Sequence, residues 1–155
     1  MLAQLPRGRE SIIFGILYHC ACSEGELIHL KRKDIDFQKR IIHFSDRKSA
    51  VPGKLLKELE EFSKDISDDD FLVRGRNGPM SAKRLQQIVT ETSQLLLGKK
   101  ITPQEIRSIH IAHALMKDIS PASISRQAGL SYQRIAQIMS EMDHHMEETC
   151  YPYEL

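Results

Sequence analysis

The chain has 155 residues, of which 41% are hydrophobic and 28% are charged, and its formal net charge is +1. This balance is typical of a globular protein with a buried core; it excludes a disordered chain and gives no global attraction for nucleic acid. Three cysteines are too few for a disulfide framework, and no signal peptide or membrane-spanning run is evident. We therefore expect a cytoplasmic protein with no membrane partner.

Two helices are predicted at the start of the chain. Residues 11–18 form an uninterrupted apolar run, which indicates a buried helix. Ser23 and Glu26 have the spacing of a capping box and begin the second helix. Cys20 and Cys22 lie between the helices. We interpret them as buried small side chains rather than metal ligands, because no other cysteine lies nearby.

The next segment is basic and predicts a small antiparallel sheet. Between Lys31 and Lys54, eight basic residues stand against three acidic ones, so one face of the molecule is expected to be cationic. Residues 35–37 and 41–44 flank a basic turn, which is typical of a β-hairpin. A third short strand is predicted at 49–52. A charged amphipathic helix and an acidic loop follow.

The second half of the chain predicts a turn at 74–79 and then four helices, each beginning at a hydroxyl residue that can cap it. The capping residues are Ser81, Thr102, Ser120 and Ser131. The second of these helices has a complete capping box, with proline at its first position, and carries Arg107 in its second turn. On the last helix, Ile135, Ile138, Met139 and Met142 are expected to share one face.

Two pieces of sequence stand out by their order and spacing. They are Gly25-Glu26-Leu27 leading to Lys33-Asp34-Ile35-Asp36, and Ile101-Thr102-Pro103 leading to Arg107 and Ala112-His113. With the order of predicted elements, they resemble the catalytic domain of the tyrosine recombinase (phage integrase) family, from about Arg9 to about Met142. The resemblance implies a mainly helical α+β fold with a small three-stranded antiparallel sheet. We expect a single domain over 1–155, a tail from about 143, and no N-terminal core-binding domain.

In that family a tyrosine attacks the scissile phosphodiester and becomes linked to the DNA 3′ end. Two arginines and two histidine-like donors stabilise the transition state, and a hairpin lysine protonates the leaving oxygen. This chemistry implies no cofactor and no metal. His144 and His145, together with His110 or His113, are the one candidate metal cluster, and we interpret the adjacent pair as solvated.

This chain departs from the family at most of the catalytic positions. The positions equivalent to first arginine, hairpin lysine, histidine, second arginine, second histidine and nucleophile are Ser23, Lys48, Gln104, Arg107, Leu130 and Met139. Arg47 competes with Lys48 for the hairpin position. Methionine cannot act as the nucleophile, and the tyrosines nearest in sequence lie at the wrong places. These are Tyr132, Tyr151 and Tyr153.

The resemblance therefore implies a protein of DNA recombination or integration that binds double-stranded DNA weakly and salt-dependently, and that does not cleave it. The residues expected to contact phosphate are Lys33, Arg47, Lys48, Gln104 and Arg107. Arg107 also has a structural interpretation, as one half of an ion pair with Glu26 or Glu105 that holds the fold.

Two other functions remain open. The fold could serve protein interaction, with a homo-oligomer or a recombinase partner held through the C-terminal tail. Alternatively, residues 120–138 have the helix, glycine turn and helix of a helix-turn-helix regulator, with Gln133 and Arg134 available for base edges.

Overall fold

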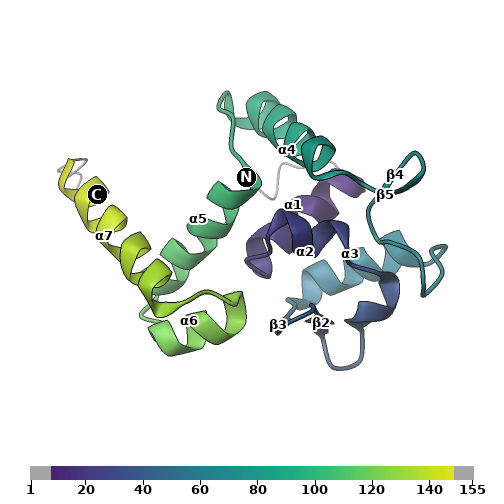
Figure 1. The fold of residues 1–155 in the computed structure, drawn as a ribbon, viewed down its shortest axis with the longest axis horizontal. Coiled ribbons are helices and arrows are strands. Elements are labelled where there is room, and N and C mark those ends of the chain that lie inside the picture. The colour runs from purple at the N-terminus through teal and green to yellow at the C-terminus, as the bar shows by residue number, and fades with distance from the viewer. Residues whose placement is uncertain (1–7, 149–155) are drawn as a thin grey trace.

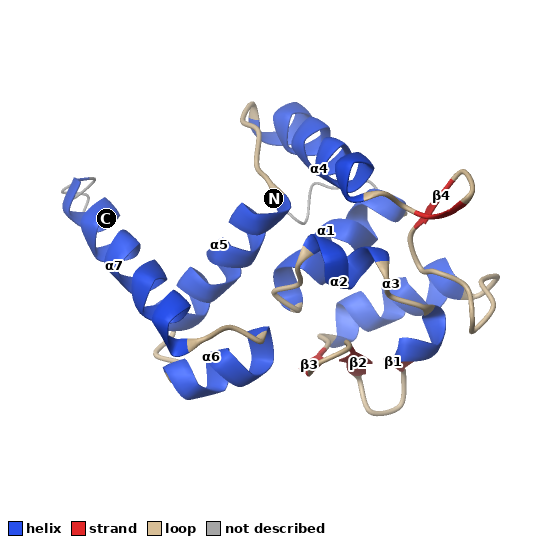
Figure 2. Cartoon of the chain, in the orientation of Figure 1, coloured by secondary structure: helices blue, strands red, loops and turns tan. Residues whose placement is uncertain are grey.

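Helices make up most of the described chain, which in this computed structural model comprises residues 8–148, with side chains for residues 8–141 (Figure 1). Two very small sheets complete the architecture (Figure 2). The elements in chain order are α1 (Arg9–His19), α2 (Glu24–Ile28), the 3-10 turn η2 (Arg32–Asp34), β1 (Ile35–Asp36), β2 (Ile41–His43), β3 (Lys48–Ala50), α3 (Gly53–Ser63), β4 (Arg74–Gly75), β5 (Gly78–Pro79), α4 (Ala82–Leu97), α5 (Pro103–Met116), α6 (Pro121–Ala128) and α7 (Tyr132–Glu148). The mainly helical α+β prediction is confirmed.

The first hydrophobic core surrounds α1, whose residues 12–17 are all buried. Helices α3, α4 and α5 all pack against α1, which lies at the centre of the view in Figure 1. Gly15 allows α3 to come close, because a Cβ at this position would lie 2.6 Å from Leu55 Cδ1. The apolar run at 11–18 therefore forms the buried helix that it predicts, and the buried Cys20 and Cys22 extend the same core.

The three-stranded sheet is antiparallel in the order β1-β2-β3. Ile42 pairs with Ser49 and both point inward, while His43 and Lys48 are exposed on the other face. The third strand begins at Lys48, one residue earlier than predicted, and ends before Val51. It ends there because Pro52 has no N–H for a ladder and instead forms the N-cap of α3.

A second sheet was not predicted. Residues 74–79, expected to be only a turn, contain the two-residue strands β4 and β5, which pair Arg74 with Pro79 and Gly75 with Gly78. Strands this short show no alternation of apolar and polar residues, so nothing in the sequence distinguishes them from a turn. The consequence is a short hairpin that presents its arginines beside the start of α4.

A second, smaller core lies between α5, α6 and α7, at the end of the molecule that carries the C-terminus in Figure 1. Helix α5 belongs to both cores, because Ile106 is buried in the first and Ile111 in the second. Ile135 and Ile138 of α7 are buried as predicted, but Met139 is 42% exposed, and the side chain of Met142 lies outside the described residues.

The predicted caps form as expected. Ser23 and Thr102 make complete capping boxes, and the side chains of Ser81, Ser120 and Ser131 accept backbone hydrogen bonds. The predicted tail from about 143 is helical as far as Glu148, and its remainder, with Tyr151 and Tyr153, lies outside the described residues. Among residues 8–148, no helix is both long and apolar enough to cross a membrane.

Candidate nucleic-acid interface

Arg47 lies buried at the junction of α1, α2 and α6. It follows the tight turn after β2, in which the Phe44 N–H donates to the Arg47 carbonyl at 2.8 Å. Its side chain is only 7% exposed. The guanidinium donates to Glu26 Oε2 at 2.9 Å, to the Cys20 carbonyl at 2.8 Å and to the Gln127 carbonyl. The donors of this arginine are therefore engaged by the protein itself.

Glu26 is held in place by the cap of α2. Its carboxylate accepts the Ser23 N–H at 3.0 Å, and the Ser23 hydroxyl accepts the Glu26 N–H at 3.2 Å. Burial by itself raises the pKa of Glu26, but the hydrogen bonds from Arg47 and Ser23, with the charges of Arg47 and Arg107, outweigh it and leave the pKa lowered. Ser23 thus serves as the cap of α2.

Arg107 lies beside this ion pair without joining it. Its Nη2 donates to the Ala128 carbonyl at 2.7 Å, and its buried Nε has no hydrogen-bond partner among the described residues. Burial lowers the pKa of Arg107, and the charge of Arg47 adds to this, while Glu26 opposes it. The predicted ion pair of Arg107 with Glu26 or Glu105 is wrong, because Glu26 pairs with Arg47 and Glu105 caps α5.

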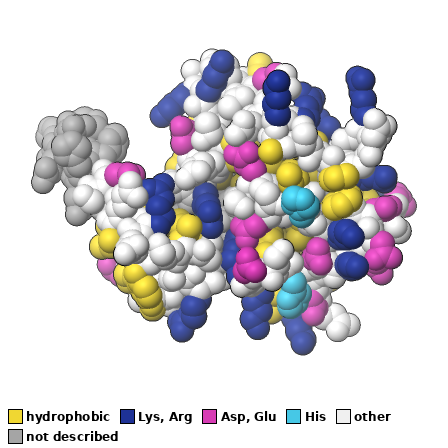
Figure 3. Space-filling model, in the orientation of Figure 1, with side chains coloured by type: hydrophobic (Ala, Val, Ile, Leu, Met, Phe, Trp, Pro, Cys, Tyr) yellow, Lys and Arg dark blue, Asp and Glu magenta, His cyan; other side chains and the backbone are white. Residues whose placement is uncertain are grey.

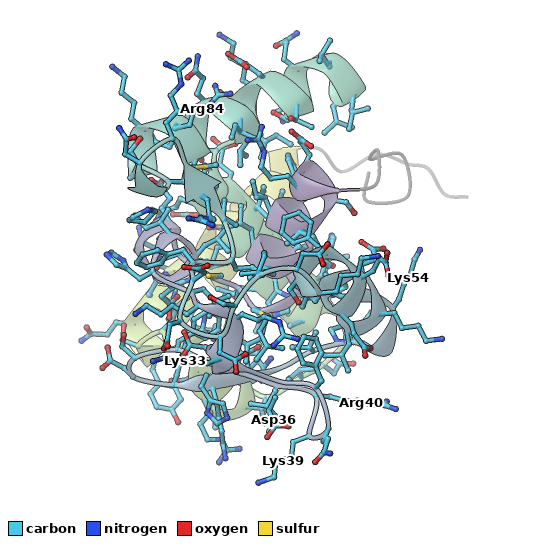
Figure 4. The ribbon with its side chains drawn as sticks, turned by 90° about the vertical axis from the view of Figure 1, so that its right-hand side faces the viewer. Lys33, Asp36, Lys39, Arg40, Lys54 and Arg84 are labelled. Atoms are coloured by element: carbon cyan, nitrogen blue, oxygen red, sulfur yellow. The ribbon has the colours of Figure 1, made fainter. Side chains whose placement is uncertain are left out.

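The remaining predicted site residues take no part in the hydrogen bonds of Arg47 and Arg107. Gln104 is exposed one turn before Arg107, and Lys48 is exposed on β3. Leu130 packs on the second core. Lys33 forms an ion pair with Asp69 of the acidic loop at 3.1 Å, and in Figure 4 it lies between Arg84 and the turn that carries Lys39. The structure therefore brings together Ser23, Arg47 and Arg107, but not Lys33.

The two buried cysteines have no reactive character. Burial raises the pKa of Cys20 to about 11 and raises that of Cys22 well above its usual range. Both thiols are therefore protonated at neutral pH, and a protonated thiol is a poor nucleophile. Their burial in the first core confirms the interpretation of the pair as small buried side chains.

Residues 120–138 form two helices joined at Gly129, as a helix-turn-helix requires, but both helices bury apolar side chains in the second core. Gln133 is exposed. Arg134 is 30% exposed and lies 3.9 Å from Glu141. Of the two proposed base-reading residues, only Gln133 therefore lies fully open to a ligand.

A cluster of arginines lines a hollow that the sequence did not reveal. Arg9, Arg74, Arg76 and Arg84 border a cavity of about 840 Å³ between β4–β5 and the start of α4, which we term the arginine groove. Only Arg9 and Arg74 have carboxylate partners within 4.0 Å among the described residues, and the Arg74 contact is long, at 3.8 Å. In Figure 3, Lys and Arg side chains gather along the upper edge, over α4.

No family model matches the chain. Among curated proteins, tyrosine recombinase XerA of Thermococcus onnurineus is 25% identical, over 92% of this chain and 55% of that protein. ATP-dependent RNA helicase DBP3 of Candida glabrata is 32% identical over 73% of this chain but only 22% of its own length, too little of that protein to indicate its family. The chain spans about half the length of the recombinases it matches.

Solved structures agree on the fold. The crystal structure of XerA recombinase superposes with a TM-score of 0.75 at 20% identity, over 94% of this chain and 59% of that one. XerH recombinase bound to its palindromic difH substrate gives a TM-score of 0.77 at 14% identity, over 96% of this chain and 48% of that one. The chain thus has the catalytic-domain fold of the tyrosine recombinases, and its recombinase-named relatives confirm the resemblance that its sequence predicts.

Proposed function

We propose that this chain binds duplex DNA through the phosphate backbone, in a process of DNA recombination or integration, and does not cleave it. The observation that carries the proposal is the arginine groove. Four arginines converge on one hollow with few carboxylates to neutralise them, and arginine donates to two phosphate oxygens at once. That XerH is solved bound to a DNA substrate supports DNA as the ligand.

Arg107 is the second contact that we propose, because it alone among the residues expected to contact phosphate has a buried N–H without an acceptor in the described structure. A missing hydrogen bond of this kind costs about 1–3 kcal/mol, so a phosphate oxygen that drew the guanidinium toward it would relieve a real penalty. Lys48, Gln104 and Lys33 are exposed and supply weaker contacts. We assign Arg47 to holding the fold, since its donors are engaged by protein oxygens.

The proposed absence of cleavage rests on the side chains at the positions equivalent to the family's catalytic residues. A thioether at Met139 has no proton to lose and cannot form a phosphoester, and Leu130 cannot donate a hydrogen bond. Of the described tyrosines, Tyr18 is hydrogen-bonded to His113, and Tyr132 lies on α7 two turns before Met139. Losing one transition-state donor costs about 3–4 kcal/mol, and here several positions have changed together.

DNA binding is tested by fluorescence anisotropy of a labelled duplex across salt concentrations. The double variant Arg76→Ala/Arg84→Ala should bind more weakly and lower the slope of log affinity against log salt by about two, since each phosphate contact contributes about 0.9. The matched control is Lys99→Ala/Lys100→Ala, which removes the same charge from exposed residues at the opposite end of α4. Equal losses in both variants would contradict a localised groove.

Cleavage is tested with nicked duplexes that trap a covalent intermediate. The parent should give no adduct that survives SDS, and an adduct would refute the proposal. A restored variant, Ser23→Arg with Gln104→His, Leu130→His and Met139→Tyr, tests the alignment. Arg47 already forms an ion pair with Glu26, beside residue 23. A second version of the variant should therefore add Arg47→Ala, and we expect only this version to have space for the new arginine side chain at position 23.

A second function, docking of a partner on α7, is favoured by one observation. Tyr132 and Met139 are seven residues apart on one face of α7 and are 61% and 42% exposed. Sedimentation velocity should show concentration-dependent association that Tyr132→Gln/Met139→Gln removes. A parent that stays monomeric at high concentration would exclude self-association through this face.

A further inference from the structure

Three histidines surround one tyrosine where α1 meets α5. The ring of Tyr18 stands nearly perpendicular to those of His19, His110 and His113, with centroid distances of 5.0, 5.5 and 5.7 Å. The Tyr18 phenol oxygen lies 2.6 Å from His113 Nδ1. We term His19, His110 and His113 the histidine cluster. His113 belongs to the sequence motif behind the recombinase resemblance, but neither the six family-equivalent catalytic positions nor the proposed DNA contacts include any of the three histidines.

The surroundings of the histidine cluster are unfavourable to positive charge. Burial lowers the pKa of His110, and His19, His113 and Arg47 lower it further, while the Tyr18 backbone has a smaller opposite effect. Burial also lowers the pKa of His19. Arg107, one turn earlier on α5, is a further cation. Glu26 of α2, whose charge acts on Arg107, is already paired with Arg47.

The histidine cluster also occupies a mechanically important position. Helix α5 packs against α1, and it forms the second core with α6 and α7. His110 lies between Ile106, buried in the first core, and Ile111, buried in the second. Electrostatic repulsion at a protonated His110 would therefore act on the segment of α5 that connects the two cores. The same repulsion would act on Arg107.

We propose that the histidine cluster is an acid-sensitive contact between α1 and α5. Its uncharged rings hold α5 on α1 at neutral pH. Their protonation in mildly acidic solution loosens α5, α6 and α7 from the first core. Protonated imidazoles would stand close to one another and to Arg47, and none of the three histidines has a carboxylate partner among residues 8–141. Clusters of histidines act in this way as pH sensors in other proteins. This proposal does not depend on DNA binding.

The sign of the effect follows from proton linkage. In the unfolded chain His19 and His110 titrate at their ordinary value of 6.5, whereas in the folded protein they bind protons only at lower pH. The unfolded state therefore binds more protons, and stability is full above pH 6.5 and falls as the pH drops below it.

The test measures urea unfolding of the full chain between pH 5 and pH 7.5. We expect the unfolding equilibrium constant to rise on acidification by about tenfold for each unit by which a histidine pKa is lowered on folding. His110→Asn should flatten this dependence. If His110→Asn does not fold, His19→Gln is the second variant. It should flatten the pH dependence of the unfolding equilibrium constant in part. The control His43→Gln alters an exposed histidine on β2 and should leave the dependence unchanged.

Amide hydrogen exchange separates release of α5–α7 from general acid unfolding. At pH 5.5, after correction for intrinsic rates, exchange should accelerate in α5 and α7 before α3, and His110→Asn should remove that difference. The proposal is overturned if the pH dependence of stability is the same in the parent, His110→Asn and His19→Gln. It is also overturned if α3 and α5 open together at every pH.

Discussion

Replacing Arg47 by methionine removes the buried cation at the junction of α1, α2 and α6 while keeping much of the side-chain length. The change leaves the Glu26 carboxylate, only 24% exposed, without its partner, and leaves the Cys20 and Gln127 carbonyls without donors. Breaking a buried ion pair from one side costs about 3–5 kcal/mol. Because Glu26 keeps some solvent contact and its bond from Ser23, we expect the lower end, about 3 kcal/mol.

The assay is urea unfolding at pH 7, read as a shift in midpoint at constant slope. Lys48→Met is the matched control, since it removes the same charge from the next residue, which is exposed, and should change stability by less than about 0.5 kcal/mol. If Arg47→Met were as stable as this control and instead lost DNA affinity, Arg47 would be a phosphate ligand and the structural assignment would be refuted.

Glu26 adds a pH signature to the same experiment. Its lowered pKa contributes stability that is present above the ordinary value of 4.5 and is lost as the pH falls below it. In Arg47→Met the main hydrogen bonds that lower this pKa are gone, and burial alone would raise it. The stability of the variant should therefore fall less steeply than that of the parent between about pH 5 and pH 3.

Three further substitutions test local features by the same unfolding assay. Ser23→Ala removes the cap of α2 and should cost about 1 kcal/mol. Gly129→Ala should cost at least about 1 kcal/mol, because φ is +68° and the new Cβ would lie 2.5 Å from Arg47 Cδ; combining it with Arg47→Ala, which removes Cδ, should cost less than the sum. Leu95→Gln alters a side chain that is 86% exposed and should change stability by less than about 0.5 kcal/mol.

Local sequence signals predicted the elements well, because caps and apolar periodicity act over a few residues. The Thr102 capping box and the αL glycine that ends α4 are both recognisable without tertiary information. The hairpin at 35–44 was equally accessible, since apolar strands flank a basic turn. Two-residue strands such as β4 and β5 carry no such signal, and they were missed.

The site was harder to predict because its contacts join distant parts of the chain. Arg47 is bound by Glu26, 21 residues away, and by the Gln127 carbonyl, 80 residues away. From the sequence, either Arg47 or Arg107 could form an ion pair with Glu26. Only the three-dimensional structure shows that Arg47 forms it and Arg107 does not. The arginine groove is similar, because it gathers Arg9 from α1 with three arginines from the β4–α4 region.

The division of α5 between two cores has a consequence for how the molecule folds. Among the side chains that the structure describes, residues 8–141, the second core contains six buried ones, one of which, Ala21, comes from the loop after α1. A cluster of that size cannot offset the conformational entropy of three helices by itself. Helices α6 and α7 should therefore fold only after α5 has docked, as a dependent cooperative unit whose opening free energy lies below that of the rest of the protein. Limited proteolysis should accordingly release a resistant N-terminal fragment before any C-terminal one.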